Sequence, residues 1–394
     1  MKLLHISDCH LGGWKDERLE ELNFMAFCHI VDEGIKNNVD GIIIAGDFFD
    51  IPMPSPKIFI RVVKKLKEVV NKGIKIYAVE GSHDIANNIG IINFLEAAEI
   101  IKNVDFRKSE SIDYFIDGDL FIVGLAGKKR GKETYEVKEL KEFLEKNKKN
   151  FIDKKKVLIV HSNIKELSDI PGESISINDL PDYFNYYALG HIHDKKIVKR
   201  SNRFYVYPGP TFPTNFEEFE RLKPCGFIIN LEKNELKEIP INVCEVLNIK
   251  INATNKDPFS LTEEIVEELK KNEIKNKIIT LRIEGIMEKG SSGQIDFPRI
   301  NETVEKSNSL LLRNTSKLYS KEFEIKESED IFHYDLNSIE KEFVKKFENN
   351  ILIFELIDLL NLEKLEGETN AKFEERLLKQ IKEKEEFILE KLKC

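Results

Sequence analysis

Residues 78–84 read AVEGSHD, an apolar run that ends in Gly, Ser, His and Asp. The apolar part has the composition of a buried strand, and the polar residues follow where that strand would end. Histidine and aspartate are common metal ligands and acid–base groups. The stretch therefore predicts a strand with a candidate metal site at its carboxyl end.

Four other apolar runs end in the same way. They are LHISDCH with Asp8 and His10, IIIAGDFFD with Asp47 and Asp50, VLIVHS with His161, and YALGHIH with His191 and His193. In an open α/β sheet the carboxyl ends of the strands converge on one edge, where such proteins bind ligands. Five of the eight histidines lie at these ends. Each motif alone is as easily a structural turn or a hydrogen-bonded histidine, but the five in this order indicate one metal site.

The strand-like runs alternate with amphipathic helices from residue 1 to about 243. Nearly continuous apolar strands predict an α/β layered fold, with sheets buried on both faces. One helix is predicted between Ser55–Pro56 at its start and Gly73 at its end. Two later stretches, RFYVYPGP (203–210) and CGFIINLEKNELKEIPI (225–241), are more typical of antiparallel strands separated by turns.

The pattern changes after residue 243. Residues 244–318 are expected to form a small α+β unit of cap or accessory size, and residues 319–334 a polar, acidic linker. Residues 335–394 show apolar side chains at steps of three and four, which predicts two amphipathic helices. The chain is thus expected to carry its site in residues 1–243.

The composition excludes several classes of protein. Apolar residues make up 41% and charged residues 33% of the 394 residues, which is typical of a globular protein rather than a disordered one. The net charge of −9 argues against a protein that coats nucleic acid by charge alone. Five cysteines without C-x-x-C spacing favour a reducing compartment. Neither a secretory leader nor a membrane-spanning run is evident, so we expect a cytoplasmic protein.

The order of the motifs resembles the calcineurin-like metallophosphoesterase superfamily, whose pattern is D-x-H, G-D-x-x-D, G-N-H-D/E, H and G-H-x-H. This chain shows it as DCH, GDFFD, GSHD, VHS and GHIH between residues 8 and 193. Within the superfamily the chain is similar to the Mre-eleven/SbcD nucleases of DNA double-strand-break repair. HISDCHLG (5–12), YPGPT (207–211) and a cap-sized unit followed by a helical tail carry this narrower likeness.

The resemblance implies a two-metal phosphodiesterase that uses Mn²⁺ or another divalent ion. It would act as an exonuclease on double-stranded DNA and as an endonuclease on single-stranded DNA. Asp8, His10, Asp47 and His193 would hold one ion, and Asp47, Ser82, His161 and His191 the second. His83 would be the catalytic imidazole, with Asp50 as the carboxylate that orients it.

Ser82 departs from the family pattern, which has Asn at this position. The carbonyl oxygen of Asn reaches the second metal, whereas a Ser hydroxyl is shorter and a poorer neutral donor. Ser82 could ligate directly, ligate through water or leave a vacant position. A catalytically weakened scaffold that bridges DNA therefore stays open beside the nuclease, as does another phosphatase or phosphodiesterase of the superfamily.

Two basic stretches, GKKRGK (127–132) and KKIVKR (195–200), are candidate contacts to DNA phosphates. The residues expected to take part are Lys128, Lys129, Arg130, Lys195 and Lys196, although a charge run is often only solvated surface. No base-reading motif is evident, which fits sequence-independent contact to the DNA backbone.

The resemblance also implies partners. The C-terminal helices would dock onto an SMC-like ATPase of the Rad-fifty/SbcC type, in a cytoplasmic, nucleoid-associated complex. The apolar helix expected within 89–101 is either ordinary core or a homodimer contact through Ile89, Ile92 and Leu95.

Overall fold

The computed structural model describes residues 1–321, apart from 87–88, 108–112, 128–132 and 169–173, together with Phe373, Arg376, Leu378 and Lys379. The chain divides into two units, residues 1–322 and 323–394. In the second unit the four described residues are helical. The predicted pair of C-terminal helices otherwise lies outside the described residues.

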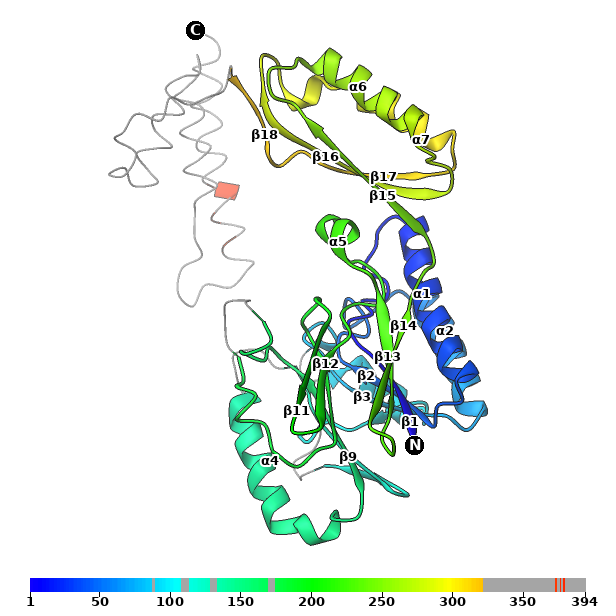
Figure 1. Ribbon diagram of the computed structural model, residues 1–394, viewed down its shortest axis with the longest axis vertical. Coiled ribbons are helices and arrows are strands. Elements are labelled where there is room, and N and C mark those ends of the chain that lie inside the picture. The colour runs from blue at the N-terminus through cyan, green and yellow to red at the C-terminus, as the bar shows by residue number, and fades with distance from the viewer. Residues whose placement is uncertain are drawn as a thin grey trace, which may run out of the picture. The chain divides into compact units, whose positions relative to one another are not determined.

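Two six-stranded sheets form the centre of the first unit (Figure 1). The first sheet contains, in spatial order, β14 (Glu235–Pro240), β13 (Cys225–Asn230), β1 (Lys2–Ile6), β2 (Gly41–Ala45), β3 (Lys75–Val79) and β6 (Lys102–Asn103). The second contains β11 (Lys196–Arg200), β12 (Arg203–Tyr207), β10 (Tyr186–Gly190), β9 (Lys155–His161), β8 (Leu120–Leu125) and β7 (Phe115–Asp117). Strands β2 and β3 of the first sheet contact β8, β9 and β10 of the second.

The central strands of each sheet are parallel and are buried on both faces. β1, β2, β3 and β6 run in parallel, as do β8, β9, β10 and β12. The five residues of β2, GIIIA, are all buried. Ile43 and Val79 of the first sheet share one hydrophobic core with Ile159 and Ala188 of the second. The predicted α/β layered fold is confirmed.

Helices cover the outer face of each sheet. α1 (Glu17–Lys36), α2 (Pro56–Asn71) and α3 (Ile91–Ala97) pack on the first sheet, and α4 (Glu133–Asn147) packs on the second. α2 begins where the sequence predicted, because Ser55 accepts a hydrogen bond from the amide of Ile58. It ends just before Gly73, which has a φ of 79°.

Two expectations about local structure need correction. β12 was expected to pair with antiparallel neighbours, but it pairs in parallel with β10 and antiparallel only with β11. No strand was expected over the basic stretch 195–200, where β11 lies. β11 is an exposed edge strand whose lysines and arginine hide the apolar alternation that identifies a strand.

The helix expected within 89–101 is shorter than predicted and is part of the core. α3 covers Ile91–Ala97, and the side chains of Ile92 and Leu95 are fully buried in the chain's own hydrophobic cluster. This agrees with the ordinary-core interpretation of these two residues. The side chain of Ile89 lies outside the described part of the chain.

A third sheet follows the two central ones. It contains β15 (Glu245–Asn252), β16 (Lys277–Met287), β17 (Leu310–Asn314) and β18 (Leu318–Ser320), all parallel to β16. The helices α6 (Pro258–Lys271) and α7 (Phe297–Glu305) bury a separate hydrophobic cluster against it. We call residues 245–320 the accessory sheet unit; the domain limits at 243 and 318 stay predictions.

A short helix, α5 (Phe216–Arg221), joins the accessory sheet unit to the central sheets. Glu220 accepts a hydrogen bond of 2.9 Å from Nε of Arg282 in β16. Asn248 in β15 donates to the carbonyl oxygen of Glu220 at 3.0 Å. In the described part of the chain, no helix is long and apolar enough to cross a membrane.

Candidate metal centre

The carboxyl ends of five strands bring the predicted ligands together. Asp8 and His10 follow β1, Asp47 follows β2, His83 follows β3, His161 ends β9, and His191 and His193 follow β10. Asp8, His10 and His193 offer ligand atoms that lie within 4.8 Å of one another. Asp47, His161 and His191 do the same, and a third such group joins His10 to Asp50 and His83.

Four of these residues adopt left-handed backbone conformations. The φ angles are 51° for Asp8, 42° for His10, 47° for Asp47 and 92° for His191. Such conformations cost on the order of 1 kcal/mol or more each, and they persist where the surroundings over-determine them. Here the amide of Asp8 donates to the Gly46 carbonyl at 3.0 Å, and that of His10 donates to the Asp47 carbonyl at 3.1 Å. The loops after β1 and β2 therefore hold each other in place.

His10, His161 and His193 share one feature: Nδ1 of each ring faces an oxygen that can only accept a hydrogen bond. The acceptors are Asp50 Oδ1 for His10 (3.1 Å), the Ala45 carbonyl for His161 (2.8 Å) and Glu218 Oε1 for His193 (2.6 Å). In each ring Nδ1 carries a hydrogen, so Nε2 is the nitrogen that can bind a metal ion. Metal-binding histidines are oriented in this way in proteins generally.

The free Nε2 atoms face other electron-rich atoms. Nε2 of His10 lies 3.3 Å from Nε2 of His193. Nε2 of His161 lies 3.1 Å from Oδ2 of Asp47, yet it makes no aligned hydrogen bond. Lone pairs that face one another in a buried site repel unless a cation lies among them. The donor set of imidazoles and carboxylates therefore fits a divalent metal.

The electrostatics of the site also favour positive charge between these side chains. Burial opposes ionisation of Asp47, but the neighbouring His161 and His10 outweigh it and hold the pKa of Asp47 well below its usual range. Burial lowers the pKa of His161, but the charge of Asp47 raises it by more, and the net pKa is about 10. The charge of Asp47 that favours a proton at Nε2 of His161 equally favours a divalent metal ion at that position.

Two buried carboxylates, Glu218 and Asp84, hold the residues of the centre in position through hydrogen bonds. Glu218 of α5 is buried, and besides His193 it accepts from the amide (2.7 Å) and hydroxyl (3.0 Å) of Thr214. Asp84 is fully buried and accepts from the amides of Phe48, Phe49 and Gly81, which ties the loop after β2 to the loop after β3.

The sequence profile of the calcineurin-like phosphoesterase superfamily domain matches residues 1–222, which include every residue of this centre. The chain belongs to the calcineurin-like phosphoesterase superfamily. Phosphoesterases of this superfamily bind divalent metal ions, in agreement with the facing lone pairs described above. The predicted resemblance is confirmed.

Curated relatives carry the name DNA double-strand break repair protein Mre11. The protein from Sulfurisphaera tokodaii is 34% identical over 205 residues, which cover 50% of this chain and 50% of that protein. The protein from Saccharolobus solfataricus is 27% identical over 299 residues, which cover 72% of this chain and 75% of that protein. The chain thus matches only half of the length of the first of these relatives.

Among solved structures, a dimetal phosphatase from Danio rerio aligns with a TM-score of 0.42 at 10% identity. It covers 61% of this chain and 98% of the phosphatase. A likeness at this score carries no argument about function.

Asp50 lies at the phosphoesterase site, but its contacts differ from those expected. Its carboxylate accepts from His10, and its Oδ1 lies 3.8 Å from Nδ1 of His83. His83 instead donates from Nδ1 to the backbone carbonyl of Asp50 at 2.8 Å. Asp50 thus contacts both histidines, one through its side chain and one through its backbone.

Ser82 lies beside the second group of ligands. A Cβ on Gly127 would come within 3.1 Å of the Ser82 amide nitrogen and 2.5 Å of Cδ2 of His161, so Ser82 and His161 both lie beside Gly127. Ser82 is half-buried. Its position agrees with the predicted neighbourhood, while its role as a ligand stays a prediction.

The predicted DNA contacts are only partly within the described chain. Lys128, Lys129 and Arg130 lie outside it. Lys195 and Lys196 are exposed and lie two and three residues after His193. Sequence reasoning missed Glu218, because Asn215–Glu218 reads only as a helix cap and nothing in the sequence connects it with a histidine 25 residues away.

Proposed function

We propose that the chain is the Mn²⁺-dependent nuclease subunit of a DNA double-strand-break repair complex. It acts as an exonuclease on double-stranded DNA and an endonuclease on single-stranded DNA. The observation that carries this proposal is the set of imidazole Nε2 atoms that face one another and the Asp47 carboxylate across one buried site. The names of the curated relatives support DNA as the substrate.

Two ions are assigned to this site. Asp8, His10, Asp47 and His193 would hold one, and Asp47, Ser82, His161 and His191 would hold the other. Ligand atoms of Asp8, His10 and His193 lie close together, as do those of Asp47, His161 and His191. Oxygen and imidazole ligands suit Mn²⁺, although other divalent ions are possible. The nearby Cys9 does not compete, because its Sγ points to the Ser7 carbonyl at 3.9 Å and burial raises the pKa of its thiol. Bound divalent ions would supply the Lewis acidity that phosphodiester hydrolysis needs.

His83 is the proposed catalytic imidazole. Because Nδ1 donates to the Asp50 carbonyl, Nε2 is left to exchange a proton with substrate. The side chain is 48% exposed, unlike His10 at 6%, so substrate can reach it. His83 can therefore protonate the leaving oxygen or stabilise its charge. Asp50 acts as a positioning residue through its contacts to His83 and His10.

Ser82 supports a second candidate function, a DNA-bridging scaffold with weakened catalysis. A Ser hydroxyl is a poorer neutral ligand than the Asn amide oxygen of the family. The other ligands of the second ion, Asp47, His161 and His191, are within ligand distance of one another. We therefore favour the active nuclease.

The remaining parts of the chain are assigned by resemblance. Residues 1–243 form the nuclease domain, residues 244–318 a cap that contacts DNA, and residues 319–334 a linker. Residues 335–394 dock onto an SMC-like ATPase of the Rad-fifty/SbcC type. The complex is a homodimer in the cytoplasm, associated with the nucleoid. Because Ile92 and Leu95 are buried, the dimer contact must use other residues.

The proposal is tested by incubating the purified chain with linear double-stranded DNA and circular single-stranded DNA in Mn²⁺, beside His83→Ala. The nuclease proposal expects wild-type cleavage of both substrates and an inactive variant. No cleavage by wild type, with cleavage gained by Ser82→Asn, would instead favour the scaffold. Rapid hydrolysis of a small phosphate monoester without DNA cleavage would favour a phosphatase of the superfamily.

A further inference from the structure

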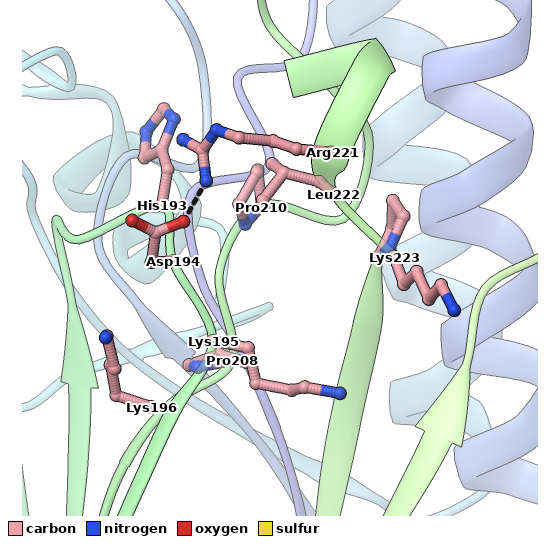
Figure 2. Close-up of a pocket in the computed structure, with 10 residues that line it drawn as sticks. His193, Asp194, Lys195, Lys196, Pro208, Pro210, Arg221, Leu222 and Lys223 are labelled. Atoms are coloured by element: carbon pink, nitrogen blue, oxygen red, sulfur yellow. Dashed lines mark hydrogen bonds and ion pairs between the residues drawn. The ribbon is translucent and has the colours of Figure 1, made fainter. Parts of the chain in front are cut away.

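A basic pocket opens beside the metal centre (Figure 2). Its volume is about 410 Å³, and His193 belongs to both its lining and the metal centre. Four cationic side chains line it: Lys195, Lys196, Arg221 and Lys223. One acidic side chain, Asp194, lines it as well. The lining therefore carries a clear excess of positive charge next to a proposed metal ligand.

Two of these cations are already paired and two are not. Lys195 donates to Glu238 at 2.7 Å, and Arg221 pairs with Asp194, as Figure 2 shows. Within the described residues, Lys196 and Lys223 form no ion pair, and both are exposed. Cations without an acidic partner favour an anionic ligand, because no group of the protein balances their charge.

The pocket is built from rigid segments. Gly209 in the YPGPT segment has a φ of 76°, and a Cβ there would lie 2.5 Å from the carbonyl oxygen of His193. Only glycine allows this close approach, and the flanking Pro208 and Pro210 restrict the same loop. Arg221 ends α5, the helix whose Glu218 contacts His193. The loop and the helix therefore fix one wall of the pocket and the position of Arg221 in the chain relative to the metal centre.

We propose that this pocket binds a backbone phosphate of the nucleic acid, next along the strand to the phosphate at the metal centre. Arg221 contacts the phosphate in the pocket by exchanging Asp194 for it. Lys196 and Lys223, which lie on opposite sides of the pocket in Figure 2, contact the same strand on either side. This inference rests on the proposed nuclease function and adds Arg221 and Lys223 to its DNA-binding residues. Contact to phosphates alone carries no base preference, which agrees with sequence-independent binding.

The test compares Lys196→Ala/Lys223→Ala with Lys64→Ala/Lys67→Ala, which removes the same charge from exposed positions of α2. Both pairs are made in the full chain carrying His83→Ala, to limit cleavage. Fluorescence anisotropy measures the Kd for a labelled duplex at several salt concentrations. Calorimetry of Mn²⁺ binding, together with circular dichroism, checks that the metal centre and the fold are intact.

The pocket pair should weaken DNA binding by roughly tenfold or more and lower the slope of log Kd against log salt by about 2. The control pair should change either value much less. Equal losses in both pairs, or no loss in the pocket pair, would overturn the pocket while leaving the nuclease proposal intact. If the His83→Ala parent bound no DNA at all, the nuclease proposal itself would fail.

A second arm separates a backbone phosphate from a free one. Inorganic phosphate and a mononucleotide are titrated into the parent and into the pocket pair. Binding only at millimolar concentration or above is expected, because a single phosphate makes few contacts. Micromolar affinity that is lost in the pocket pair would overturn the assignment to backbone and indicate a site for a free anion.

Discussion

Glu218→Gln tests how the second layer of residues supports the metal centre. One carboxylate oxygen of Glu218 accepts from His193, and the other accepts from the amide and hydroxyl of Thr214. A glutamine has the same shape but carries an NH2 group in place of one oxygen. In either orientation of that glutamine side chain, its NH2 group faces another hydrogen-bond donor, Nδ1 of His193 or the backbone amide of Thr214. The substitution therefore disturbs the orientation of the His193 ring without creating a cavity.

The size of the effect follows from these contacts. The His193–Glu218 hydrogen bond is 2.6 Å long, and Glu218 is 4% exposed. Burial raises the pKa of Glu218, but the contact with His193 outweighs it and lowers the pKa, so the carboxylate is charged. Losing such a support costs about 10- to 100-fold in metal affinity. That corresponds to about 1.4–2.7 kcal/mol.

Calorimetric titration with Mn²⁺ measures this change. The ion held by Asp8, His10 and His193 should bind 10- to 100-fold more weakly, with the other ion little affected. Glu217→Gln is the matched control, because Glu217 lies on the same helix but is exposed and accepts from Asn314. Two ions bound by Glu218→Gln with wild-type affinity, or equal losses in the control, would refute the reasoning.

Three further predictions use other residues. His83→Ala should abolish DNA cleavage while Mn²⁺ affinity, measured by calorimetry, stays close to wild type; a parallel loss of metal would show that His83 is a ligand. Ser82→Asn should tighten binding of the second Mn²⁺ ion, because an amide oxygen is the better neutral ligand, and an unchanged titration would indicate that position 82 does not reach the metal. Burial lowers the pKa of His5 to about 3, whereas in the unfolded chain it is about 6.5. Below pH 6.5 the unfolded chain therefore binds a proton at His5 that the folded chain does not bind. Stability is then lost as pH falls from 6.5 towards 3. Between pH 7.5 and 5, wild type should lose about 2 kcal/mol more than His5→Gln in urea unfolding, and equal losses would contradict a buried neutral His5.

Local sequence patterns predicted the parts of the fold that local physics determines. The apolar strands β1, β2 and β3 and the caps of α2 depend on neighbouring residues, and they lie where the sequence placed them. The nearness of Asp8, His10 and Asp47 follows from the rule that parallel strands of one sheet end at one edge. His161 and His193 belong to the second sheet and meet them only because the two sheets pack against each other.

The rest depends on contacts between distant segments. Glu218 meets His193 only because α5 folds back against the loop after β10, and no local pattern records that approach. The carboxylate of Asp50 accepts from His10, while His83 donates to the Asp50 backbone carbonyl; both contacts join residues at least 33 positions apart in the chain. β11 was missed for a different reason: its exposed charges remove the periodicity that identifies a strand.

Anomalous diffraction at the manganese edge, from crystals of the full chain grown with Mn²⁺, tests the central claim most directly. The account predicts two peaks, one within ligand distance of Asp8, His10 and His193 and the other within ligand distance of Asp47, His161 and His191. A single peak would contradict the two-metal site. Two peaks elsewhere in the chain would contradict the whole assignment.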